Sequence, residues 1–96
     1  MTSQIGDYRF TVSSEAAASI HDDGLVILDN RSGRLFRSNS TGARIWHCIE
    51  ERLPVEAIAD VISREYQIAA TTALEHTARF LTELERRNLI QRTDKS

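Results

Sequence analysis

One stretch decides the fold, Asp23–Trp46, which reads DGLVILDNRSGRLFRSNSTGARIW. It begins with a continuous apolar run, Leu25–Leu28, and such a run between turn residues is typical of a strand inside a sheet. Asn30–Gly33 supplies turn chemistry, and Arg34–Ser38 then returns as a second strand. Asn39–Thr41 offers three residues that favour the N-cap of a helix. The stretch therefore predicts a hairpin that leads directly into a helix.

The returning strand should lie at a free edge of a small sheet. Leu35 and Phe36 are adjacent, so their side chains point to opposite faces. We expect one of them in the core and the other exposed or covered by another group. The unpaired N–H and C=O groups of such an edge can bind an extended peptide.

Further strands are predicted before this hairpin. Ala16–Ile20 is followed by a turn, which favours a strand over a helix despite its alanines. Tyr8–Val12 alternates weakly and predicts a short strand or an extended arm. The ends of the chain, at about residues 1–7 and 93–96, are expected to be frayed.

Three helices should follow the strands. The first buries Ile45, Trp46 and Ile49 on one face and ends at the Leu53-Pro54 pair. The second uses the helical spacing of Val55, Ile58, Ala59 and Ile62. The third, at about Thr71–Asn88, carries an apolar stripe with Phe80 at its border: Leu74, Thr77, Ala78, Leu81 and Leu84. Asn88 suits the end of this helix, and Leu89-Ile90 should dock back on the core.

Strands segregated from helices predict an α+β fold that is winged helix-turn-helix-like, a three-stranded antiparallel sheet followed by three helices. The 96 residues fit one domain over 1–96, with its core at about 16–90.

The net charge of −2 argues against nucleic acid as a partner. No apolar run is long enough to span a membrane. One cysteine, Cys48, indicates a reducing compartment, so a cytoplasmic location is expected.

No residue pattern indicates catalysis or a cofactor. The histidines, His21, His47 and His76, lack the short ligand spacing that zinc sites use, so no metal is expected. Cys48 lies beside the apolar stripe of the first helix, and a small buried thiol explains it better than a nucleophile does. We therefore predict a protein that is not an enzyme, although a small redox enzyme using Cys48 is an alternative.

Charged residues flank the stripe of the third helix: His76, Arg79, Glu83, Arg86 and Arg87. They fit a solvated helix surface. They fit equally well one wall of a binding groove whose other wall is Arg34–Ser38.

At this level of detail the chain resembles the PqqD-like family, the peptide-recognition domains of ribosomally made, post-translationally modified peptides. The resemblance covers about Ile20–Ile90. Its markers are four segments in a fixed order and spacing: Asp23–Asp29, Ser32–Phe36, Asn39–Trp46 and Val55–Ala59, followed by the ending Phe80–Ile90.

The resemblance implies that a leader peptide adds as a strand to the third strand and packs against the third helix. It implies a peptide-binding site made of these residues: Arg34, Leu35, Phe36, Arg37, Ser38, His76, Arg79, Phe80, Glu83 and Arg87. The partners would be the precursor leader peptide and a separate processing enzyme. A lasso peptide leader protease is the favoured enzyme, and a peptide chaperone role in pyrroloquinoline quinone biosynthesis, with a radical enzyme, is the alternative.

One position departs from the family, in which a leucine often precedes the asparagine at the start of the first helix. Here that position is Ser38, which should alter the affinity or register of the peptide more than the fold. The same helix order also allows a winged-helix DNA-binding regulator, although the third helix begins without cations. An exposed edge permits either a monomer or a strand-exchanged dimer.

Overall fold

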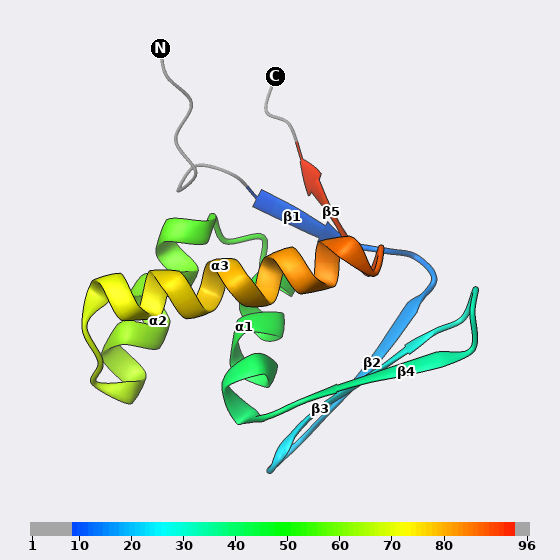
Figure 1. Ribbon diagram of the computed structural model, residues 1–96, viewed down its shortest axis with the longest axis horizontal. Helices are drawn as coiled ribbons and strands as arrows, with labels where there is room; N and C mark the ends of the chain where they lie inside the picture. Colours follow the sequence, from blue (N-terminus) through cyan, green and yellow to red (C-terminus); the bar gives the residue numbers. More distant parts are fainter. Residues whose placement is uncertain (1–8, 94–96) are drawn as a thin grey trace.

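A computed structural model describes residues 9–93 of the chain (Figure 1). Its elements are, in order, β1 (Arg9–Val12), β2 (Ala16–His21), β3 (Gly24–Asp29), β4 (Arg34–Ser38), α1 (Ser40–Glu50), α2 (Val55–Tyr66), α3 (Ala70–Arg86) and β5 (Ile90–Thr93). The predicted α+β class is confirmed, with the sheet preceding three helices in the described residues.

The central sheet has the order β2-β3-β4, and both of its strand pairs are antiparallel. Leu25 and Ile27 of β3 are fully buried, which confirms the predicted interior strand. At Gly33 the turn between β3 and β4 takes a φ of 75°, a conformation that glycine adopts without strain. The Asn39 side chain then caps α1 by accepting a hydrogen bond of 2.9 Å from the Gly42 N–H.

A second sheet was not predicted. β1 and β5 pair antiparallel, from Arg9 opposite Thr93 to Val12 opposite Ile90, and lie side by side near the end of α3 (Figure 1). The expected frayed end was therefore wrong at Thr93, which is the last residue of β5. The other frayed end, Met1–Asp7, lies outside the described residues, as does Tyr8.

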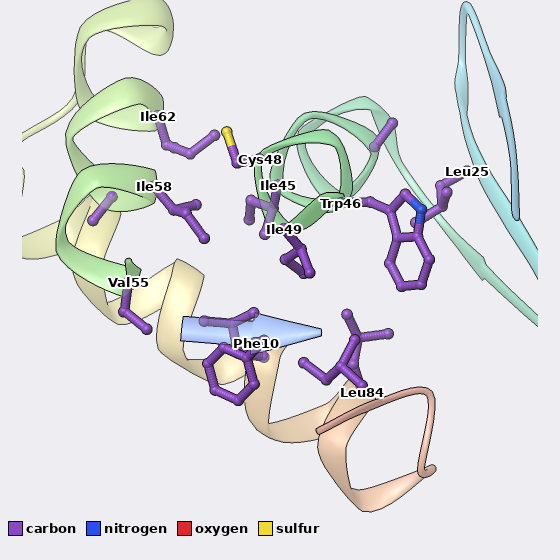
Figure 2. Packing of buried hydrophobic residues seen from close by; sticks show 14 of the residues in the cluster. Phe10, Leu25, Ile45, Trp46, Cys48, Ile49, Val55, Ile58, Ile62 and Leu84 are labelled. Atoms are coloured by element: carbon purple, nitrogen blue, oxygen red, sulfur yellow. The ribbon is translucent and has the colours of Figure 1, made fainter. Parts of the chain in front are cut away.

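The core lies between the sheet and the helices. Figure 2 shows Trp46 pointing from α1 toward Leu25 of β3, whereas Cys48 points from the same helix toward Ile62 of α2. The predicted face of α1 is confirmed, because Ile45, Trp46 and Ile49 are at most 1% exposed. Helix α1 thus joins the sheet to the other helices, and it fixes where β4 ends.

The buried face of α3 differs by one position from the prediction. Leu74 is 41% exposed, whereas its neighbour Ala73 is fully buried. Thr77, Leu81 and Leu84 are buried as predicted. The buried stripe of α3 therefore runs through Ala73, and Leu74 lies at the surface. At the other end Asn88 has a φ of 61°, the left-handed conformation expected just after a helix.

Candidate functional site

The candidate site is a groove between the outer strand of the sheet, β4, and the facing side of α3. Two hollows lie along it. One of about 410 Å³ lies at the end of β4, lined by Ser38, Asn39, Thr41, Gly42, Ile45, His76, Arg79, Phe80 and Glu83. The other, of about 250 Å³, lies at the start of β4, and its lining includes Arg34, Leu35, Phe36, Arg87 and Leu89.

In residues 9–93, the outer edge of β4 has no neighbouring strand. The Asn30 N–H donates 2.8 Å to the Glu15 carbonyl, so β3 residues of even number bond to β2. Asp29 bonds to the other side, because its carbonyl accepts from the Gly33 N–H at 2.7 Å. By this alternation Phe36 and Ser38 bond to β3, and the N–H and C=O groups of Leu35 and Arg37 point outward. Two residues of β4 can therefore form ladder bonds with an added strand.

The side chains of β4 alternate between the inner and outer faces of the sheet. Phe36 is half-buried and packs on the core beneath α3, whereas Leu35 is 52% exposed on the outer face of the sheet. The expectation that one of this pair contacts the core is thus confirmed. Arg37 lies on the same outer face as Leu35, since residues two apart share a face.

An aromatic contact separates the two hollows. The ring centroids of Phe36 and Phe80 lie 6.1 Å apart with a tilt of 49°, a favourable arrangement for two rings. The Arg87 guanidinium lies 4.8 Å from the centroid of the Phe36 ring. These contacts fix the Phe36 ring as the floor of the groove between its two ends.

The carboxylate of Glu83 is held by two arginines. Arg87 donates to it at 2.7 Å and Arg86 at 2.9 Å. The hydrogen bond from Arg87 lowers the pKa of Glu83 from its ordinary value, and the charges of both arginines act in the same direction. Glu83 therefore stays ionised, and each of its two oxygens accepts one hydrogen bond from its own helix, which leaves a position on each for a donor from a ligand.

The first hollow owes its depth to two small residues. A Cβ atom built on Gly42 would lie 2.8 Å from the Ser38 Cβ and 3.1 Å from the Phe80 Cε1 atom. Because Gly42 has no side chain, Ser38 fits against the first turn of α1, and the ring of Phe80 closes the other side.

The groove brings most of the predicted site residues together. Five of them line the first hollow, namely Ser38, His76, Arg79, Phe80 and Glu83. Four line the second, namely Arg34, Leu35, Phe36 and Arg87. Arg37 lines neither hollow.

Several lining residues escaped sequence reasoning: Asn39, Thr41, Gly42, Ile45 and Leu89. One signal could have found part of this set. Gly42 is a glycine inside a helix, where it is unfavourable unless something packs closely against it.

The sheet has a second free edge, which the sequence did not draw attention to. β2 is bordered only by β3 in the described residues, and Ala17–His21 are exposed. A hollow of about 360 Å³ meets this strand only at its end, where Ile20, His21 and Tyr66 contribute to the lining. No helix lines the length of β2 as α3 lines β4.

Chemistry-bearing groups are sparse in residues 9–93. No three His, Cys, Asp or Glu side chains there are grouped as metal ligands would be. Cys48 is 1% exposed, and burial raises the pKa of its thiol, which disfavours the reactive thiolate. Within the same residues, no helix combines the length and apolar character needed to cross a membrane.

The sequence pattern of the family described as "Coenzyme PQQ synthesis protein D (PqqD)" matches residues 24–90. The chain belongs to the PqqD family. The match spans β3 to the first residue of β5 and so includes both walls of the groove. No curated protein matches the chain significantly.

Two solved structures share the fold of this PqqD-family chain. One, "TbiB1 in Complex with the TbiA(beta) Leader Peptide", is 28% identical with a TM-score of 0.80, and the match covers 88% of this chain and 99% of that one. The other, "Lasso peptide synthetase B1 complexed with the leader peptide", is 26% identical with a TM-score of 0.79, covering 86% and 98% respectively. In both cases nearly the whole of the other chain corresponds to this one.

Proposed function

We propose that this chain binds the leader region of a ribosomally made precursor peptide and presents it to a separate processing enzyme. The leader adds as a strand to β4, with α3 as the facing wall. The observation that carries the proposal is the free β4 edge beside two hollows, in a fold shared with two proteins whose structures are described as complexes with leader peptides.

The energetics require both parts of the groove. Each main-chain hydrogen bond of an added strand contributes only about 0.5–1.5 kcal/mol net, and ordering a flexible peptide offsets much of that. Two outward-facing residues, Leu35 and Arg37, cannot supply the affinity alone. Apolar side chains entering the two hollows on either side of Phe36 would supply the remainder.

The proposed site consists of Arg34, Leu35, Phe36, Arg37, Ser38, His76, Arg79, Phe80, Glu83 and Arg87. Within it Leu35 and Arg37 offer hydrogen-bonding groups, and Phe36 with Phe80 offers apolar surface. The chain acts by binding, and the chemistry belongs to the partner enzyme.

We test strand addition by titrating fluorescent leader peptides of lasso peptide precursors and following their anisotropy. Copies of a binding peptide with one N-methylated amide each remove one donor at a time. Because only alternate amides of a strand face its neighbour, binding should weaken at every second position. Uniform sensitivity, or none, would contradict the proposal, as would the absence of saturable binding up to high micromolar concentration.

Variants of the protein locate the edge. Arg37→Pro removes an outward N–H of β4 without removing a bond to β3, and it should abolish most of the binding. The matched control is Ala18→Pro, which removes the corresponding outward N–H of β2 and should leave the affinity unchanged. Circular dichroism first establishes that both variants fold. Equal binding by wild type and Arg37→Pro would rule out β4 as the docking strand.

Phe80→Ala tests the helical wall. We expect it to weaken leader binding about tenfold or more, because it removes a buried aromatic contact from the centre of the groove. Leu74→Ala, an equally simple truncation on the same helix outside the groove, should leave binding unchanged. Equal losses in both variants would place the peptide elsewhere on α3.

The lasso peptide pathway is favoured because one similar structure is described as a lasso peptide synthetase B1 complexed with a leader peptide, and the other is described as a complex with a leader peptide. A role in pyrroloquinoline quinone biosynthesis is the alternative, favoured by the family to which the chain belongs. Titrating the protein with a leader peptide from each kind of pathway discriminates between them, since only the native partner should bind tightly.

A further inference from the structure

The groove carries an excess of positive charge that the rest of the chain does not share. Arginines stand at both of its walls: Arg34 and Arg37 on β4, and Arg79, Arg86 and Arg87 on α3. The whole chain, by contrast, has 14 acidic and 12 basic residues and a net charge of −2. A cationic groove on an acidic protein indicates selection for a ligand of opposite charge.

Three of these arginines have no carboxylate partner. Arg86 and Arg87 are satisfied by Glu83. Within residues 9–93, the guanidinium groups of Arg34, Arg37 and Arg79 form no ion pair or hydrogen bond. By comparison, Arg44 and Arg64, which lie outside the groove, are paired with Glu65 and Asp60. Arg52, outside the groove, also forms neither interaction, so three of the four such arginines in residues 9–93 lie where the peptide would lie.

The unpaired arginines lie on different sides of an added strand. On the side of the sheet that faces α3, an added strand would place its side chains near Phe36 and the two hollows. On the outer side, its side chains would lie beside Arg37. At the rim of the first hollow, Arg79 of α3 stands next to His76, and both side chains are exposed. The first turn of α1 also faces this hollow and contains no acidic residue.

We propose that the groove selects a leader segment that combines apolar with acidic residues, with one acidic side chain on the outer face beside Arg37 and one at the rim of the first hollow near Arg79. This inference rests on the proposed function and adds the chemical class of its peptide. Cross-strand pairs of opposite charge stabilise a sheet, so one acidic residue beside Arg37 would also set the register of the added strand.

The probe for this proposal is a displayed library of random dodecapeptides, selected on the immobilised full-length chain. We expect the selected peptides to combine apolar with acidic residues and to contain few lysines and arginines. A synthetic copy of the best binder should bind more weakly as salt is raised, since exposed charges are screened. Replacing its acidic residues by their amides should weaken it about threefold to fivefold each.

Two variants of the protein test whether Arg37 and Arg79 cause the acidic preference. Arg37→Gln and Arg79→Gln should each weaken the selected peptide by about threefold to fivefold and should no longer distinguish it from its amide copy. Arg64→Gln, on the surface of α2, is the matched control and should bind like wild type. Selection of neutral or basic peptides whose binding is insensitive to salt and to both variants would overturn the acidic preference.

Failure of the proposed function gives a different result. If the selected peptides bind Arg37→Pro as well as wild type, or if no peptide is selected, both the docking edge and the acidic preference are wrong. If the selected peptides bind wild type but not Arg37→Pro, and are neutral or basic, docking on β4 is supported and only the acidic preference is wrong.

Discussion

Ser38 and Gly42 share one small space at the junction of β4 and α1. The Ser38 side chain lies where a Cβ atom of residue 42 would be, and Phe80 bounds the same space. The departure from the family pattern at Ser38 thus coincides with a site where small volume decides the packing. A larger residue at either position would push into the first hollow of the groove.

We predict that Gly42→Ala destabilises the protein by about 1–2 kcal/mol, because overpacking outweighs the better helix propensity of alanine. Urea unfolding followed by circular dichroism measures this. In a Ser38→Gly background the added methyl group has room, so Gly42→Ala should then be neutral or stabilising. If Gly42→Ala stabilises the wild-type chain, the close contact between residues 38 and 42 is wrong.

The elements differ in how far local sequence specified them. The hairpin and the start of α1 were predicted correctly because their signals are local: a turn with Gly33, and the Asn39 cap. The exposure of Leu74 was missed because two overlapping stripes on α3 have the same helical spacing. Which stripe is buried depends on how α3 packs against the rest of the fold, and spacing within α3 alone does not contain that information.

Two truncations on α3 test its buried face. Leu84→Ala should cost about 2–5 kcal/mol of unfolding free energy, because the side chain is fully buried and leaves a cavity. Leu74→Ala should cost less than about 1 kcal/mol, as is usual for surface positions. Chemical denaturation of both variants compares them directly, and similar costs would mean that the predicted stripe through Leu74 was right after all.

At the scale of the whole molecule, the pairing of β1 with β5 joins segments from the two ends of the sequence. Neither strand exceeds four residues, and each has little pattern of its own. Their pairing depends on a partner far away in the chain, which explains why β5 was missed. Nine of the ten residues predicted for the site lie around the two hollows, where strand position and helix facing place them, and their role in binding stays a prediction.

Phe10 shows what this pairing contributes to stability. It is 4% exposed and belongs to the main core cluster, although β1 lies outside the central sheet. Phe10→Ala should therefore cost about 3–5 kcal/mol of unfolding free energy. Gln91→Ala, an exposed position on the partner strand β5, is the control and should change little. A small effect of Phe10→Ala on the urea midpoint would show that β1 is dispensable for the core.

Because Arg9 lies opposite Thr93, the path of the chain enters and leaves the fold at neighbouring points. A domain whose ends lie close together can be inserted at a single point in a surface loop of another protein, without stretching either connection. The same closeness permits circular permutation: a short linker could join β5 to β1, and new ends could be cut at the Asp22-Asp23 turn. The fold is therefore suited to insertion as a domain within another protein, such as an enzyme.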